Sequence, residues 1–178
     1  MTTTYEFNFQ NEWDNHYVRN KKRFIQKIKE QFILRYETQW TKYVQTDKKL
    51  TQYALFKKNL HIEPYLDFLN NDTTARIEYT KLRISAHKLK IETDRYTNTP
   101  MNQRLCRECG EIEDEKHFLL KCSLNKEIRD NLFISLMDIF PDFRNLTDED
   151  KFIFMMGFQD YEMVQLVSKF IVNSLENR

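Results

Sequence analysis

Residues 106–122 read CRECGEIEDEKHFLLKC and contain all three cysteines of the 178-residue chain, together with one of its four histidines. The spacing is Cys106-x2-Cys109-x7-His117-x4-Cys122. Thiolate and imidazole are the ligands of four-coordinate structural zinc sites. Four protein ligands leave no open position for water, so the pattern predicts one structural, non-catalytic Zn2+ held by these four residues.

Two other interpretations of the cysteines stay open at this point. In the first, the chain buries three free thiols beside a surface histidine and binds no metal. In the second, Cys106 and Cys109 form a redox pair, but such pairs usually open a helix after a strand, and no strand pattern precedes Cys106. An odd number of cysteines fits a chelate better than a disulfide framework, and it favours a reducing compartment.

The composition favours helices over sheets. Two glycines and three prolines are few for this length, whereas sheets with tight hairpins use more of both. No apolar run approaches the roughly 20 residues needed to span a bilayer, and the start lacks a signal-peptide pattern. We therefore expect an all-α, intracellular protein, nuclear or cytoplasmic, without a membrane partner.

The N-terminal part predicts one long amphipathic helix. Residues 11–45 contain no Pro or Gly, and large apolar residues recur at three- and four-residue steps, with a possible break near Asn20. This apolar and aromatic stripe is typical of a core or a partner-facing surface, and less often of a base-stacking platform. The stripe consists of Trp13, Tyr17, Phe24, Ile28, Phe32, Tyr36, Trp40 and Tyr43.

Shorter helices are expected along the rest of the chain. Before the cysteines, a helical piece is expected over 49–59, Pro64 fits the first turn of a short helix, and Asp72 or Thr73 is the N-cap of a helix whose apolar positions are Ile77, Tyr79, Leu82 and Ala86. After the cysteines, Ser123 or Asn125 caps one helix, and a second helix starts at Thr147 with three acids and stops at Gly157. A last apolar stripe over 163–175 predicts the final helix. The predicted fold is a long N-terminal amphipathic helix plus a helical bundle with one embedded structural CCHC zinc site. Its segments are 1–60 (basic, aromatic-striped helical segment), 61–100 (helix and connector), 101–125 (CCHC zinc motif) and 126–178 (C-terminal helical bundle), and we expect them to form one compact unit.

The net charge of +1 hides a strong segregation. Residues 19–60 carry twelve Lys or Arg against three acids, whereas residues 128–178 carry nine acids against five bases. Lys and Arg clusters gain affinity for DNA or RNA through counterion release. The predicted nucleic-acid contacts are Arg19, Lys21, Lys22, Arg23, Arg83, Arg104 and Arg107.

The stretch KLRISAHKLKIETDRYTNTPMNQRLCRECGEIEDEKHFLLKC, residues 81–122, resembles the C-terminal region of reverse transcriptases from non-LTR (LINE-type) retrotransposons. There, a similar helix, an IE-x-GRY-like connector and a CCHC motif follow one another. The resemblance covers roughly residues 48–178 and implies metal binding by Cys106, Cys109, His117 and Cys122. Asp94 stands in place of the glycine of the connector.

Enzymatic activity is not expected. No YxDD-type polymerase motif occurs, and the acids around Pro141-Asp142 and Glu149-Asp150-Lys151 are better explained by a helix start than by a nuclease site. The other histidines, His16, His61 and His87, have no nucleophile nearby in sequence and are expected to be structural or exposed. The competing hypothesis is a protein-interaction or assembly subunit in which a partner binds the N-terminal helix and zinc is purely structural.

Overall fold

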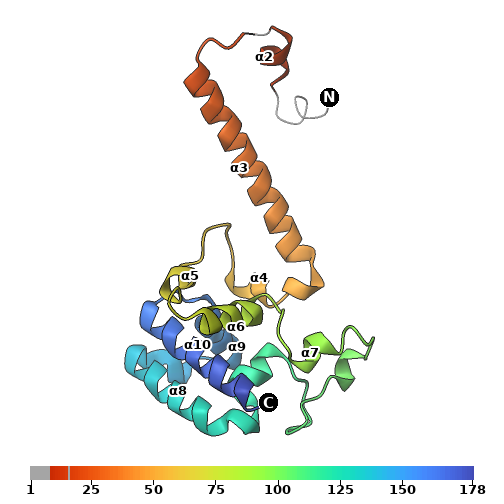
Figure 1. The fold of residues 1–178 in the computed structure, drawn as a ribbon, viewed down its shortest axis with the longest axis vertical. Helices are drawn as coiled ribbons and strands as arrows, with labels where there is room; N and C mark the ends of the chain where they lie inside the picture. The colour runs from red at the N-terminus through yellow and green to blue at the C-terminus, as the bar shows by residue number, and fades with distance from the viewer. Residues whose placement is uncertain (1–8, 16) are drawn as a thin grey trace.

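The computed structural model of the protein describes residues 9–15 and 17–178, and this part of the chain is all-α, as predicted. Within it, one isolated antiparallel bridge joins Leu105 to Ile112. The predictions for His16 and for the Trp13 side chain lie outside the described part. A long helix extends from a compact helical body (Figure 1).

The N-terminal segment consists of α2 (Gln10–Asp14) and α3 (Lys21–Thr46), so the predicted break near Asn20 is confirmed. The Asn20 side chain accepts a hydrogen bond from the Arg23 amide and so caps α3. The segment before α3 lies against its first turns, where the Phe9 and Phe24 rings meet edge to face with centroids 5.4 Å apart. Farther along, Val44 is the buried residue of α3.

The body is built around α10 (Tyr161–Glu176), which packs against α5 (Tyr65–Phe68), α6 (Thr73–Arg83), α8 (Lys126–Ile139) and α9 (Asp148–Gly157). Its predicted apolar stripe is confirmed, because that face fills the centre of the core. The buried apolar residues of α10 are Met163, Val164, Val167, Phe170 and Ile171.

Polar caps start three of these helices. Asp72 accepts from the Ala75 amide at 2.9 Å, Thr147 from the Asp150 amide at 3.2 Å, and Asp160 from the Met163 amide at 3.0 Å. Each side chain satisfies an N–H group that the helix itself leaves without a partner. Asn125 precedes α8 but makes no such side-chain bond.

Two predictions need correction, and a third holds for a different physical reason. The piece expected over 49–59 is instead the short turn η1 (Lys48–Leu50) followed by the single-turn α4 (Tyr53–Phe56). The buried face of α6 is rotated relative to the predicted one, because Ile77 is 44% exposed while Arg83 is buried. Gly157 does close α9, but glycine is needed here because another chain segment approaches closely: an added Cβ would lie 2.6 Å from Phe56 Cβ.

The connections contain further short elements, which are α7 (Lys90–Thr93), η2 (Met101–Gln103), η3 (His117–Lys121), η4 (Ser123–Asn125) and η5 (Pro141–Asn145). Among the described residues, none of the helices is both long enough and apolar enough to cross a membrane.

Candidate metal centre

The four predicted ligands come together. One ligand atom from each of Cys106, Cys109, His117 and Cys122 lies within 4.8 Å of the others. The Cys122 sulfur is 3.8 Å from that of Cys106 and 3.9 Å from that of Cys109, and all three thiols are free of disulfides. The four side chains are therefore close enough to bind one metal ion.

A tight turn places the first two ligands. The Gly110 amide donates to the Cys106 carbonyl at 2.9 Å, and the Cys106 amide donates to the Glu111 carbonyl at 2.7 Å. Gly110 has a φ of 69°, a left-handed conformation that side chains other than glycine rarely adopt. Glycine at this position lets the chain reverse directly after Cys109, so that both thiols face the same point.

A wide helical turn places the other two ligands. The Asp114 carboxylate accepts from the His117 amide at 2.7 Å and opens η3. The Cys122 amide then donates to the His117 carbonyl at 2.8 Å, a hydrogen bond between residues five apart. Such a π-type turn is rare and is frequently found at functional sites. Its wide hydrogen bond brings His117 and Cys122 to the same site although four residues separate them.

His117 is prepared as a ligand. Its Nδ1 lies 3.3 Å from a carboxylate oxygen of Glu111, and its buried Nε2 has no hydrogen-bond partner in the described part of the chain. Donation from Nδ1–H to Glu111 leaves Nε2 with an unshared lone pair. Metal-binding histidines commonly have this carboxylate partner, so the donor set fits a metal ion.

The thiols differ in their surroundings. Burial raises the pKa of the Cys122 thiol to about 11, while hydrogen bonds from the Ser123 hydroxyl and amide lower the pKa of the Cys109 thiol. A bound divalent cation deprotonates a coordinating thiol outright and so removes this difference. Arg129 from α8 donates to the Cys122 carbonyl at 2.6 Å, which attaches the site to the body.

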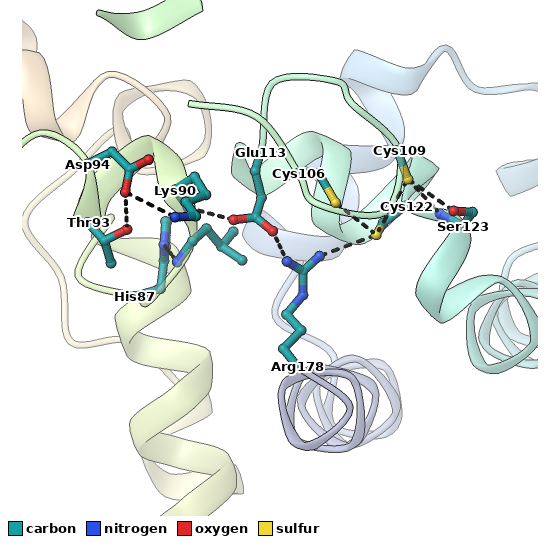
Figure 2. A network of polar contacts seen from close by, with 11 residues as sticks. His87, Lys90, Thr93, Asp94, Cys106, Cys109, Glu113, Cys122, Ser123 and Arg178 are labelled. Carbon is teal, nitrogen blue, oxygen red and sulfur yellow. Dashed lines mark hydrogen bonds and ion pairs between the residues drawn. The ribbon is translucent and has the colours of Figure 1, made fainter. Parts of the chain in front are cut away.

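A polar network surrounds the cysteines (Figure 2). Arg178 donates to Cys122 Sγ at 3.3 Å and to the Glu113 carboxylate. The other oxygen of Glu113 accepts from the Lys90 amide at 2.7 Å. The end of the chain, the α7 segment and the cysteine loop are thus joined through one carboxylate.

A second buried network was missed by the sequence analysis. Ser85 and His87 both donate to the Glu115 carboxylate, His87 Nε2 at 2.9 Å, while His87 Nδ1 accepts from the Leu89 amide. Burial would raise the pKa of Glu115, but the hydrogen bonds from His87 and Ser85 outweigh it and the net pKa is lowered. His87 is structural, as expected, but its partner lies 28 residues away and leaves no local signal.

The four N-terminal contacts predicted for nucleic acid, Arg19, Lys21, Lys22 and Arg23, are exposed at the start of α3. Arg19 and Arg23 line a recess of about 720 Å³, and Lys27 and Tyr17 line the same recess. Tyr17 is 68% exposed, so its ring is accessible to a ligand.

Arg83 is corrected. Its guanidinium is buried, pairs with Glu63 at 3.0 Å and stacks on the rings of Phe56, Tyr65 and Tyr79. A side chain enclosed in this way is not available to a phosphate.

The other two predicted arginines differ in accessibility. Arg104 is half-buried and donates to the Thr99 and Ile91 carbonyls, at 2.9 and 2.7 Å, so it supports the connector. Arg107 is exposed in the turn between the first two cysteines.

The acidic residues near residue 149 serve the fold. Glu149 pairs with Lys116, and Asp148 pairs with Lys121 at 3.3 Å, so the start of α9 is tied to η3. Among the described residues, the cysteine cluster is the one group of three or more potential metal ligands, and neither Asp142 nor Glu149 belongs to one.

No family model, curated protein or solved structure matches this chain.

Proposed function

We propose that the chain is a zinc-stabilised helical module that binds the phosphate backbone of DNA or RNA through Arg19, Lys21, Lys22 and Arg23. The zinc ion is structural, and the module has neither polymerase nor nuclease activity. We further propose, from the resemblance of residues 48–178, that it is related to the C-terminal region of non-LTR retrotransposon reverse transcriptases.

The choice of zinc rests on the donor set and its dimensions. Three thiolates and one imidazole are soft and borderline ligands, which zinc accepts and which magnesium and calcium do not favour. A tetrahedron with Zn–S bonds near 2.3 Å has sulfur–sulfur edges of about 3.8 Å. The separations of 3.8 and 3.9 Å agree with that edge length.

The single observation that carries nucleic-acid binding is the accessibility of the N-terminal basic cluster. Two acids of α9 pair with Lys116, directly before η3, and Lys121, at its end, and α3 carries its basic start away from the body (Figure 1). Within the described residues, no acidic side chain pairs with Arg19, Lys21, Lys22 or Arg23. These charges remain accessible to an external polyanion, and the exposed Tyr17 beside them offers a ring for stacking.

The test is to reverse the charge of all four residues to Glu and titrate single- and double-stranded DNA and RNA at two ionic strengths. We expect the wild-type protein to bind with an affinity that falls steeply with salt and depends weakly on sequence. The reversal should abolish binding while circular dichroism stays unchanged. Absence of binding by the wild type at low salt, or equal binding by the variant, would refute the proposal.

A second candidate function is protein binding by α3, favoured by its exposed apolar side chains. Ile25, Tyr36 and Tyr43 are 52%, 68% and 59% exposed. They are eleven and seven residues apart, so they lie on one face of the helix. A monomer rarely exposes such a stripe without a partner.

Sedimentation of the wild type and of a Tyr36→Glu variant tests one form of this candidate, pairing with a second copy. Concentration-dependent association that the variant lacks would support it. A monomeric wild type would exclude self-pairing through this face.

A further inference from the structure

A recess beside the candidate metal centre gathers positive charge. It has a volume of about 290 Å³ and lies between the cysteine loop, the α7 segment and the end of α10. Its charged lining residues are Lys88, Lys90, Arg107, Arg178, Glu108 and Glu113. Four cations therefore face two carboxylates.

One of the two carboxylates is already engaged. Both oxygens of Glu113 accept hydrogen bonds, one from the Lys90 amide and one from Arg178 (Figure 2). Glu113 is also buried. Its negative charge is compensated inside the protein, and Glu108 is the remaining acid of the lining.

Two of the four positively charged side chains have no compensating partner in the described part of the chain. Lys88 and Arg107 are exposed, and neither side chain has a hydrogen bond or ion pair within the described part of the chain. Lys88 stands between the buried His87 and Leu89, which fix the backbone at this point. Arg107 is held by the hydrogen-bonded turn from Cys106 to Gly110. Both positively charged side chains are therefore mounted on ordered backbone at the rim of the recess.

We propose that this recess binds a phosphate group of a nucleic acid, with Lys88 and Arg107 as its main contacts. The volume is at the lower end of small-molecule sites, of the order of 300 Å³, which suits one phosphate with part of its sugar. Guanidinium and ammonium groups are the usual donors to phosphate oxygens. The inference deepens the proposed function and rests on it, but it uses a surface separate from the start of α3.

The phosphate has two possible sources, an internal phosphodiester or a terminal monoester. The test therefore compares two short single-stranded oligothymidylates, one with a 5′-phosphate and one with a 5′-hydroxyl. Fluorescence anisotropy over a salt series is measured for the wild type and for a Lys88→Ala, Arg107→Ala double variant. Lys169→Ala, an exposed lysine of α10 outside the recess, is the matched control.

Loss of the phosphate contact should lower the salt slope of the double variant by about 0.7. If the ligand is a terminal phosphate, the double variant loses the preference for the 5′-phosphorylated strand. If it is an internal phosphate, both strands lose affinity equally. The control should match the wild type, and elemental analysis should show that all variants keep their metal.

An unchanged salt slope and unchanged affinities of the double variant for both strands would overturn the recess proposal. If charge reversal at Arg19, Lys21, Lys22 and Arg23 still abolishes binding in that case, the proposed function survives without the recess. If the wild type binds neither strand at low salt, the recess proposal fails, and the proposed function fails with it if double-stranded DNA and RNA are not bound either.

Discussion

At the scale of single residues, the metal centre depends on how each ligand is oriented before the ion arrives. His117 shows this best, because Glu111 holds Nδ1 and the buried Nε2 is left without a partner. The cysteine thiols are oriented by backbone turns, which glycine at residue 110 permits. Orientation by neighbours of this kind raises metal affinity without adding a ligand.

Replacing Glu111 by Ala should weaken metal binding by about 10- to 100-fold, because the imidazole loses the acceptor that fixes its tautomer and its orientation. Competition with a chromophoric chelator measures the affinity. Glu108→Ala is the control, since Glu108 is also exposed and has no contact with His117. Equal affinities in the two variants would show that Glu111 has no part in the site.

At the scale of elements, helix starts and apolar stripes follow from local sequence. Asp72 caps α6 as predicted, and the helix starts expected near Asn20 and Thr147 are also closed by these side chains, because a cap bonds to amides only a few residues ahead. The four candidate metal ligands were also predictable, since a metal ion restricts the residue types and the spacing of the side chains that can bind it. The hydrogen bond that closes the turn between His117 and Cys122 joins residues five apart, and the spacing of the ligands does not reveal it.

Features that depend on distant partners were not predictable. Arg83 was assigned to a surface because charge usually stays in water, yet Glu63 and three aromatic rings enclose it. The partner, Glu63, is 20 residues away, and the spacing of apolar residues in the sequence does not reveal such a pair. The buried face of α6 was misplaced for the same reason.

Removing Arg83 should therefore destabilise the protein. Arg83→Ala leaves Glu63 paired with Lys57 alone and opens space between the rings, so we expect a loss of about 2 to 5 kcal/mol in the free energy of unfolding, mainly from the lost packing. Chemical denaturation measures this change. Arg76→Ala on the same helix should change stability little, since that side chain is only half-buried. A smaller loss of unfolding free energy in Arg83→Ala than in Arg76→Ala would contradict the stabilising role of Arg83.

The contact between α4 and α9 predicts the sign of another substitution. Alanine normally stabilises a helix relative to glycine by about 0.5 to 1 kcal/mol. At Gly157 the added Cβ would meet Phe56 Cβ at 2.6 Å, so Gly157→Ala should instead destabilise by about 1 to 3 kcal/mol. Thermal or chemical unfolding decides between the two signs, and a stabilised variant would contradict the close approach.

At the scale of the whole molecule, the opposite charges along the chain do not cancel each other. The acidic start of α9 pairs with Lys116 and Lys121 at the two ends of the η3 segment, and the basic start of α3 lies away from them (Figure 1). The near-neutral net charge of +1 therefore combines an internally paired acidic region with an accessible basic one. Net charge alone would have hidden this arrangement.

Chelation should act locally before it acts globally. Because the cysteine loop is held by short turns and few elements, removal of the metal should speed amide hydrogen exchange in residues 100–125 first. The apolar core around α10 should keep its protection under the same mild conditions. Lowering the pH should have the same order of effects, since protonated thiols and imidazole do not bind the ion. Simultaneous loss of protection in both regions would indicate that the metal holds the entire body.

X-ray absorption at the zinc edge, combined with elemental analysis of the purified protein, tests the central claim most directly. The account predicts about one zinc per chain, three sulfur neighbours near 2.3 Å and one nitrogen near 2.0 to 2.1 Å. A metal-free protein with the same helicity and stability, or an ion whose neighbours are mainly oxygen, would contradict it.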